Sequence, residues 1–216
     1  MILPTLPSRL YAVCDAEVCA KAGWTLPDFA AACMDGGATL LQVRAKQMPS
    51  GALLDATERI MRRAAAAQAT VIVNDRADIA RLAGAHGVHV GQDDLTPTAV
   101  RQVMGAYALV GLSTHTAEQL AAATPEPVQY VAIGPVFGTA TKDTGYMPVG
   151  LPAVREAADA ARTADMPVVA IGGITLDLAP DVLEAGASAV AVITDILVGN
   201  DPATRVRAFL ERLARV

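Results

Sequence analysis

The chain has 216 residues, and its 17 Lys and Arg against 22 Asp and Glu give a formal net charge of −5. This length is enough for one sizeable hydrophobic core, and single α/β-barrel domains have a similar length. The acidic balance excludes a broad basic surface of the kind that binds nucleic acid. We therefore expect no nucleic-acid partner, and any phosphate must be held by a few local groups.

Hydropathy and cysteine content exclude several other classes of protein. Mean hydropathy is +0.37, but no apolar run approaches the roughly 18 residues that would span a bilayer, so no membrane partner is expected. The first residues lack the charged and apolar regions of an export signal, which favours a cytoplasmic location. The three cysteines, Cys14, Cys19 and Cys33, support neither a disulfide framework nor a zinc site.

Short β-branched runs alternate with Ala-rich amphipathic stretches along the whole chain, which is typical of repeated βα units. The predicted strands lie near 9–14, 38–44, 70–74, 87–90, 108–112, 129–133, 167–171 and 189–193. The predicted helices lie at 26–35, 50–68, 76–83, 97–104, 116–123, 150–163, 178–185 and 202–214.

Eight such units without a break in composition predict one domain over residues 1–216, a closed (β/α)8 TIM barrel of the α/β class. The alternative is a doubly wound sheet with a Gly-x-Gly-x-x-Gly motif after its first strand. Residues 14–24 contain no such motif. A barrel places its chemistry at the carboxyl ends of the strands.

The second predicted strand alternates strictly, so Gln42, Arg44 and Lys46 share one face. In a barrel the outer face lies under helices, and this polar face should point inward at the mouth. Two cations there indicate an anionic ligand. The alternative is an ordinary strand whose polar face meets solvent.

Carboxylates follow the third and fourth predicted strands. Asp75 follows one, Asp93 and Asp94 follow the other, and adjacent loops should bring Asp75 close to one of the pair. One or two carboxylates, completed by water and phosphate, suit Mg²⁺. The alternative for each aspartate is capping of the helix that follows.

His86 and His89 invite a metal or acid–base interpretation, but His89 alternates with valines inside a strand, which favours a hydrogen-bonded core histidine. Ser113, at the end of the fifth strand, supplies a hydroxyl to the mouth of the barrel. Covalent catalysis by Ser113 is not favoured because the chain has no Gly-x-Ser-x-Gly motif around it.

Two later segments predict phosphate binding. The loop after the sixth strand carries donors from Thr139, Thr141 and Lys142, although a long surface loop is the alternative. Gly172 and Gly173 follow the seventh strand, and a helix begins after the eighth. Together they match the standard phosphate site of barrel enzymes, in which backbone N–H groups hold the anion.

Six motifs in order resemble the thiamine phosphate synthase family over residues 10–214. They are Gln42-x-Arg44-x-Lys46, Asn74-Asp75-Arg76, Gly87-Val-His-Val-Gly91-Gln92-x-Asp94, Gly111-x-Ser113-x-His115, Gly134-Pro135-x-Phe137-x-Thr139-x-Thr141-Lys142 and Ile171-Gly172-Gly173-Ile174. The resemblance implies a (β/α)8 barrel that couples a hydroxymethylpyrimidine diphosphate to a thiazole phosphate, both small molecules, and releases diphosphate with Mg²⁺.

The resemblance also implies a role for each motif residue. It implies catalytic residues Arg44, Lys46, Ser113 and Lys142, and Mg²⁺ ligands Asp75 and Asp94. It places the pyrimidine diphosphate on Gln42, Arg44, Lys46, Asn74, Ser113 and Lys142, and the thiazole phosphate on Thr139, Thr141, Gly173, Ile193 and Thr194.

The chain departs from the family pattern at two places. Thr194 stands where the family commonly has Ser, and Asp195 brings a carboxylate next to the expected phosphate pocket, which is unfavourable unless it turns away. Cys14 stands where the family tends to have Thr. A thiazole tautomerase of the same fold and a non-catalytic thiazole-phosphate binding protein are the alternatives, and whether the chain forms a homo-oligomer is left open.

Overall fold

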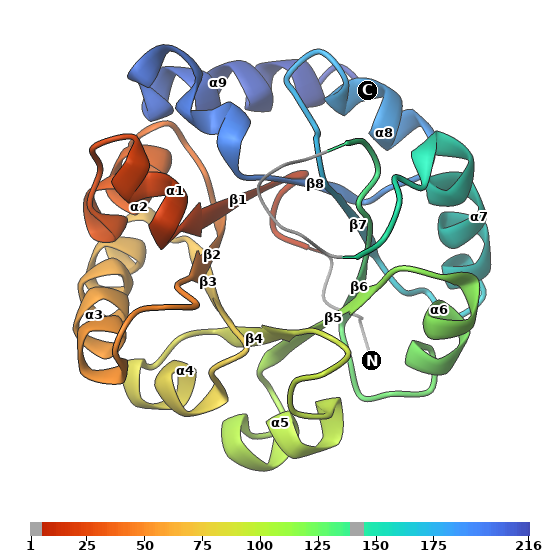
Figure 1. The fold of residues 1–216 in the computed structure, drawn as a ribbon, viewed down its shortest axis with the longest axis horizontal. Coiled ribbons are helices and arrows are strands. Elements are labelled where there is room, and N and C mark those ends of the chain that lie inside the picture. The colour runs from red at the N-terminus through yellow and green to blue at the C-terminus, as the bar shows by residue number, and fades with distance from the viewer. Residues whose placement is uncertain (1–5, 139–144) are drawn as a thin grey trace.

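The computed structural model describes residues 6–138 and 145–216. Within these residues eight strands alternate with helices in chain order (Figure 1). The strands are β1 Leu10–Asp15, β2 Leu40–Arg44, β3 Thr70–Asn74, β4 Gly87–Val90, β5 Leu109–Thr114, β6 Tyr130–Ile133, β7 Val168–Ile171 and β8 Ala189–Val192. The helices are α1 Ala16–Lys21, α2 Leu26–Asp35, α3 Ser50–Ala67, α4 Ala77–Ala83, α5 Pro97–Met104, α6 Ala117–Ala123, α7 Gly150–Arg162, α8 Ala179–Glu184, the 3₁₀ helix η1 Thr194–Asn200 and α9 Pro202–Leu213.

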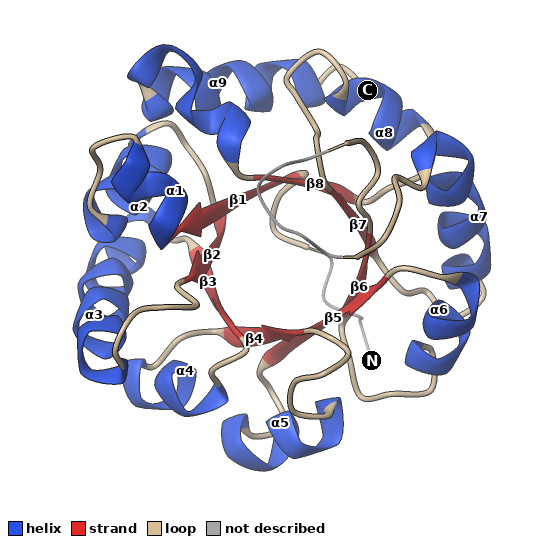
Figure 2. Cartoon of the chain, viewed as in Figure 1, coloured by secondary structure: helices blue, strands red, loops and turns tan. Residues whose placement is uncertain are grey.

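The strands close into a parallel barrel in the order β1 to β8, with β1 paired to β8 through Leu10 and Val190. The helices form a ring outside the strands (Figure 2). The predicted TIM-barrel fold is therefore confirmed. Among the described residues, no helix is long and apolar enough to cross a membrane.

The predicted boundaries agree with the observed ones within about two residues, apart from two helices that were not predicted. Helix α1 begins directly at the end of β1, where the Asp15 side chain accepts the backbone N–H of Val18 and caps the helix. The 3₁₀ helix η1 begins directly after β8, at Thr194. Both fold at the mouth of the barrel, where no linker residues signal a new element.

The barrel interior is filled by the inward-facing side chains of the strands, which form a core separate from the one beneath the helices. Tyr11, Leu40, Ile72 and Tyr130 are among its buried residues. The Tyr130 ring occupies space that Gly111 leaves open, because a Cβ at position 111 would lie 2.1 Å from Cζ of Tyr130. Gly111 thus makes room for a large side chain inside a narrow barrel.

We expect Gly111→Ala to lower the free energy of unfolding by about 2–3 kcal/mol, because the added methyl group overpacks the core and displaces the Tyr130 ring. Gly51→Ala is the matched control, since a Cβ at Gly51 of α3 would meet nothing within 4 Å. Urea unfolding of both variants measures the difference. A Gly111→Ala protein as stable as the Gly51→Ala protein would show that the ring has space to move.

Candidate functional site

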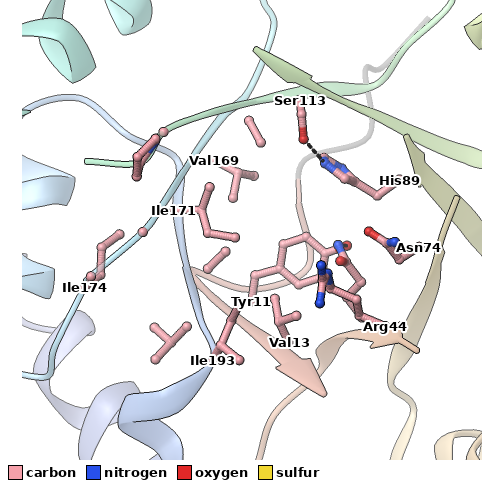
Figure 3. Close-up of a pocket in the computed structure, with 18 of the residues that line it drawn as sticks. Tyr11, Val13, Arg44, Asn74, His89, Ser113, Val169, Ile171, Ile174 and Ile193 are labelled. Carbon is pink, nitrogen blue, oxygen red and sulfur yellow. Dashed lines mark hydrogen bonds between the residues drawn. The ribbon is translucent and has the colours of Figure 1, made fainter. Parts of the chain in front are cut away.

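A cavity opens at the carboxyl ends of the strands (Figure 3). Its lining takes residues from all eight strands, and it includes seven of the predicted site residues. These seven are Gln42, Arg44, Asn74, Ser113, Gly173, Ile193 and Thr194. Lys46, Asp75 and Asp94 lie beyond the strand ends and are not part of this lining.

The two sides of the cavity differ in chemistry. Arg44, Asn74, His89 and Ser113 come from β2 to β5 and form a polar side. The facing side, from β7, β8 and the loops after them, is apolar and includes Val169, Ile171, Ile174 and Ile193 (Figure 3). The polar side suits a charged or hydrogen-bonding ligand, and the apolar side suits an uncharged ring.

Arg44 is held at the mouth of the barrel by a carboxylate from the neighbouring strand. Asp15 and Arg44 are register partners in the β1–β2 pair, and the guanidinium forms an ion pair with the Asp15 carboxylate. The Asp15 side chain is 1% exposed and that of Arg44 13%, so this pair is largely screened from water. Glu17 of α1 adds a second carboxylate oxygen at 3.8 Å. The Asp15 carboxylate therefore fixes where the guanidinium can meet an anion.

Asp75 and Asp94 face one another just beyond β3 and β4. Burial raises the pKa of the Asp75 carboxyl, Lys46 lowers it by an ion pair, and the Asp94 carboxyl, which lies within hydrogen-bonding reach, raises it again. Asp75 adopts a left-handed backbone conformation, with φ of 60°. Asp94 accepts the backbone N–H of Gly91 at 2.8 Å and does not cap α5, whose cap is Thr96. Two facing carboxylates of this kind favour a bound cation.

The donor set fits a hard divalent cation that takes its remaining ligands from elsewhere. Over residues 6–138 and 145–216, no cluster of three or more His, Cys, Asp or Glu side chains could hold a metal ion alone. Asp75 and Asp94 supply carboxylate oxygens just beyond β3 and β4, two of the strands whose residues line the cavity. Mg²⁺ is bound in proteins by one or two carboxylates together with water and substrate phosphate, so these two residues are suitable ligands for it.

His89 lies inside the barrel, as expected of a hydrogen-bonded core histidine. Its side chain is buried, Nε2 is 2.8 Å from Ser113 Oγ, and Nδ1 is 3.0 Å from the Tyr130 hydroxyl. Tyr130 in turn contacts Tyr11, and Gln42 donates its Nε2 hydrogen to Tyr11. Two predicted site residues, Gln42 and Ser113, are thus connected through Tyr11, Tyr130 and His89, none of which is a predicted site residue.

The loop after β7 approaches the loop after β6 very closely. Gly172 and Gly173 both have positive φ, of 106° and 64°, and a Cβ at Gly173 would lie 2.6 Å from the carbonyl oxygen of Gly138. The amide of Phe137 donates to the carbonyl of Gly172 at 3.0 Å. Only glycine fits these two positions without displacing the facing loop.

The Asp195 carboxylate turns away from the cavity. It accepts hydrogen bonds from Nε and Nη2 of Arg205, at 3.0 and 2.7 Å, and from the backbone N–H of Leu176. Arg205 of α9 neutralises the carboxylate, and the bond from Leu176 connects the loop after β7 to the start of η1. The charge that position 195 brings next to Thr194 is therefore balanced by Arg205, although Asp195 lines a neighbouring pocket together with Gly173 and Thr194.

Some predicted residues lie outside the described residues, and some residues at the mouth were not predicted. Thr139, Thr141 and Lys142 fall within 139–144, which the structure does not describe. His115 lines the cavity, stacks on Tyr146 with ring centroids 4.1 Å apart, and donates from Nδ1 to the carbonyl of Gly134. Gln119 donates to the Tyr146 hydroxyl at 3.2 Å. The positions of these three residues carry no periodic signal in the sequence.

Comparison with known proteins gives one consistent family. Residues 10–196, from the first residue of β1 into η1, match the family described as Thiamine monophosphate synthase. The chain belongs to the thiamine monophosphate synthase family. As an enzyme of this family it is a transferase of thiamine biosynthesis.

Individual relatives of the family cover nearly the whole chain. The thiamine-phosphate synthase of Koribacter versatilis is 45% identical over 207 residues, which is 95% of each chain. That of Anaeromyxobacter dehalogenans is 46% identical and covers 84% of this chain and 82% of its own. The solved structure of thiamine phosphate pyrophosphorylase from Pyrococcus furiosus superposes with a TM-score of 0.85 at 25% identity, over 96% of both chains. The family barrel thus extends over the same residues as the barrel described above.

Proposed function

We propose that the chain is a Mg²⁺-dependent thiamine phosphate synthase. It couples 4-amino-2-methyl-5-hydroxymethylpyrimidine diphosphate to thiazole phosphate and releases diphosphate. The observation that carries this proposal is that Arg44 lines the polar side of a cavity whose other side is apolar, while Lys46 and the facing carboxylates Asp75 and Asp94 lie just beyond the ends of β2, β3 and β4 on that side. The names of the relatives give the product, thiamine phosphate, and the family resemblance of the sequence implies the two substrates.

The polar side binds the pyrimidine diphosphate in this proposal. Asp75 and Asp94 would hold Mg²⁺, which when bound neutralises charge on the diphosphate oxygens. Arg44, fixed by Asp15, contacts the same oxygens as a preformed donor and needs no reorganisation when negative charge develops. Lys46 is freed for the diphosphate once Asp75 engages the cation, and Lys142 is a further proposed contact. Gln42, Asn74 and Ser113 hold the pyrimidine ring.

The apolar side binds the thiazole phosphate. Its ring packs against aliphatic side chains such as Ile171 and Ile193, and its phosphate meets Gly173 and Thr194 at the start of η1. Thr139 and Thr141 are further proposed contacts. The two substrates would thus be held on facing sides of one cavity, and such positioning removes much of the entropic cost of a two-substrate reaction.

The reaction needs no nucleophile from the protein. The bond between the pyrimidine methylene and the diphosphate oxygen breaks first, and both electrons leave with the diphosphate. The amino group of the pyrimidine stabilises the cation that remains, and the thiazole nitrogen then attacks it. The protein binds, orients and neutralises charge, which agrees with a hydrogen-bonded Ser113 that belongs to no nucleophile elbow.

A thiazole tautomerase of the same fold is the second candidate. Such an enzyme would isomerise the thiazole phosphate and would need neither the carboxylate pair nor the Arg44–Lys46 cations. Incubation of the purified protein with both substrates and Mg²⁺, followed by chromatography and mass spectrometry, separates the two. Thiamine phosphate formed only when both substrates and the metal are present supports the synthase. Altered thiazole phosphate without any coupling product would favour the tautomerase, and no turnover would favour a binding protein.

Gly173→Ala should raise the KM for thiazole phosphate about tenfold and leave that for the pyrimidine diphosphate nearly unchanged. A methyl group at this left-handed position meets the Gly138 carbonyl oxygen at 2.6 Å and pushes the phosphate-binding loop out of place. Steady-state kinetics with each substrate varied in turn measure the effect, with Gly51→Ala as the control. An equal rise in both KM values would mean that Gly173 supports the whole cavity and not one phosphate.

A further inference from the structure

A chain of hydrogen bonds runs through the inside of the barrel and ends at two residues of the cavity. Gln42 on β2 donates to the Tyr11 hydroxyl on β1 at 3.0 Å, and Tyr11 is 3.0 Å from the Tyr130 hydroxyl on β6. Tyr130 contacts Nδ1 of His89 on β4 at 3.0 Å, and Nε2 of His89 contacts Ser113 on β5 at 2.8 Å. The last contact joins neighbouring strands at the cavity wall (Figure 3).

The two tyrosines are neutral and each has one hydrogen to donate. Both side chains are 1% exposed. Burial raises the pKa of both phenols far above neutral pH. The chain of hydrogen bonds has four contacts, and each contact needs one hydrogen between its two heavy atoms. Each tyrosine hydroxyl has a single hydrogen, so it can donate in only one of its two contacts.

The Gln42 contact sets the direction of the whole chain. Because Gln42 donates to Tyr11, the hydroxyl hydrogen of Tyr11 has the Tyr130 oxygen as its partner. The reverse arrangement, with Tyr130 donating to Tyr11, leaves the Tyr11 hydrogen buried without an acceptor among the described residues, which costs about 1–3 kcal/mol. The Tyr130 hydrogen must then go to Nδ1 of His89, which accepts it only when unprotonated.

We propose that Tyr11 and Tyr130 are positioning residues: they hold His89 as the neutral tautomer with hydrogen on Nε2, and His89 thereby turns the Ser113 hydroxyl hydrogen toward the ligand. Ser113 Oγ accepts from His89 Nε2, so its own hydrogen is left for the cavity. At the other end, Gln42 donates one amide N–H to Tyr11, which orients the amide and leaves its carbonyl oxygen and its second N–H for the cavity. The barrel interior thus sets a donor at Ser113 and fixes the orientation of the Gln42 amide.

The direction of these hydrogen bonds restricts which ligand can bind at the polar side of the cavity. A ligand between Ser113 and Gln42 should offer a hydrogen-bond acceptor to the serine, and a donor on the ligand can pair with the carbonyl oxygen of the glutamine. A heteroaromatic ring with a ring nitrogen and an exocyclic amino group has both. This step rests on the proposed function, since the pyrimidine substrate belongs to that class, whereas the tautomer of His89 is a property of the protein alone.

The tautomer can be measured without any substrate. The chain has 3 histidines, so ¹⁵N-histidine labelling with long-range ¹H–¹⁵N correlation resolves each ring, and His89→Gln assigns the His89 signals. We expect a bare Nδ1 and a protonated Nε2 in His89 at neutral pH. A proton on Nδ1, in the other tautomer or in an imidazolium, would overturn the proposal. This result does not depend on turnover, so it is separate from any failure of the proposed function.

Kinetics test whether the tyrosines act through Ser113. Tyr130→Phe keeps the ring but removes the donor to Nδ1, and it should raise the KM for the pyrimidine diphosphate about 3- to 10-fold without changing that for thiazole phosphate. In a Ser113→Ala background the same change should have no further effect on this KM. Additive effects of the two substitutions would contradict the proposal.

Two further variants keep this test decisive. Tyr11→Phe interrupts the chain one step earlier and replaces Tyr130→Phe if that protein fails to fold. It removes the donor that sets the direction of the Tyr130 hydroxyl, so it should raise the KM for the pyrimidine diphosphate in the same direction but by less. Thr57→Val is the matched control, because it removes a fully buried hydroxyl that donates to the Leu53 carbonyl within α3. A KM for the pyrimidine diphosphate that rises as much in Thr57→Val would show a general loss of stability and not a loss of positioning.

Discussion

Replacement of Asp75, a proposed Mg²⁺ ligand, by Asn is expected to lower kcat/KM at least about a hundredfold, because loss of a direct ligand exceeds the 10- to 100-fold cost of losing an outer partner of a metal site. The substitution keeps the shape of the side chain and removes one of two facing carboxylates. Asp94→Asn should act in the same direction. Turnover measured over a range of Mg²⁺ concentrations should show a higher metal requirement in both variants.

Stability should behave differently from activity in the Asp75→Asn protein. Burial and the Asp94 carboxylate already disfavour the charged form of Asp75, so removal of its charge relieves repulsion. The lost ion pair with Lys46 costs little, because the Lys46 side chain is 41% exposed. Thermal unfolding should therefore show a Tm no lower than that of the unmodified protein. Asp93→Asn, an exposed neighbour, is the control. Unchanged turnover at limiting Mg²⁺ in Asp75→Asn would exclude Asp75 as a ligand.

Replacement of Arg44 by Ala should reduce both activity and stability. In the proposed function the guanidinium is a preformed donor to the diphosphate, and loss of such a donor lowers kcat by about 10²- to 10³-fold. The substitution also leaves the Asp15 carboxylate, 1% exposed, without its ion-pair partner. We expect the free energy of unfolding to fall by about 2–3 kcal/mol, somewhat less than for a fully buried pair because Arg44 is partly exposed.

Two companion variants separate these effects. Arg44→Lys keeps the charge but not the planar fork, so it should recover stability more than activity. Arg63→Ala removes an arginine that pairs with Asp35 on the exposed surface, where both side chains are more than 40% exposed, and should change stability by less than about 1 kcal/mol. If the Arg44→Ala protein is as stable as the Arg63→Ala protein, the buried Asp15 carboxylate does not need the ion pair with Arg44 for its stability.

The fold could be predicted because its signal is local. Each buried strand is a short β-branched run and each helix has an apolar face, so the boundaries follow from the residues themselves. Helices α1 and η1 could not be predicted because each begins where a strand ends, without a break in composition. Their starting positions are set by contacts at the barrel mouth, such as the Asp195–Arg205 pair that holds the start of η1 against α9.

In the site, too, features encoded within one segment could be predicted, and features that depend on contacts between distant segments could not. Alternation along β2 places Gln42 and Arg44 on the inner face, and the structure has both in the cavity lining. The Asp15–Arg44 pair depends on the register between two strands, which no single segment encodes. Tyr11 and Tyr130 look like ordinary core aromatics in the sequence. Their hydroxyls acquire partners only when the barrel closes and brings β1 toward β6.

The most direct measurement of the central claim is the stoichiometry of phosphorus species during the reaction. ³¹P NMR of the protein with both substrates and Mg²⁺ distinguishes the pyrimidine diphosphate, free diphosphate, the thiazole phosphate and thiamine phosphate in one sample. The proposal predicts that diphosphate and thiamine phosphate appear together in equal amounts, and that neither appears when the metal is chelated. Release of orthophosphate, or loss of thiazole phosphate without diphosphate, would contradict it.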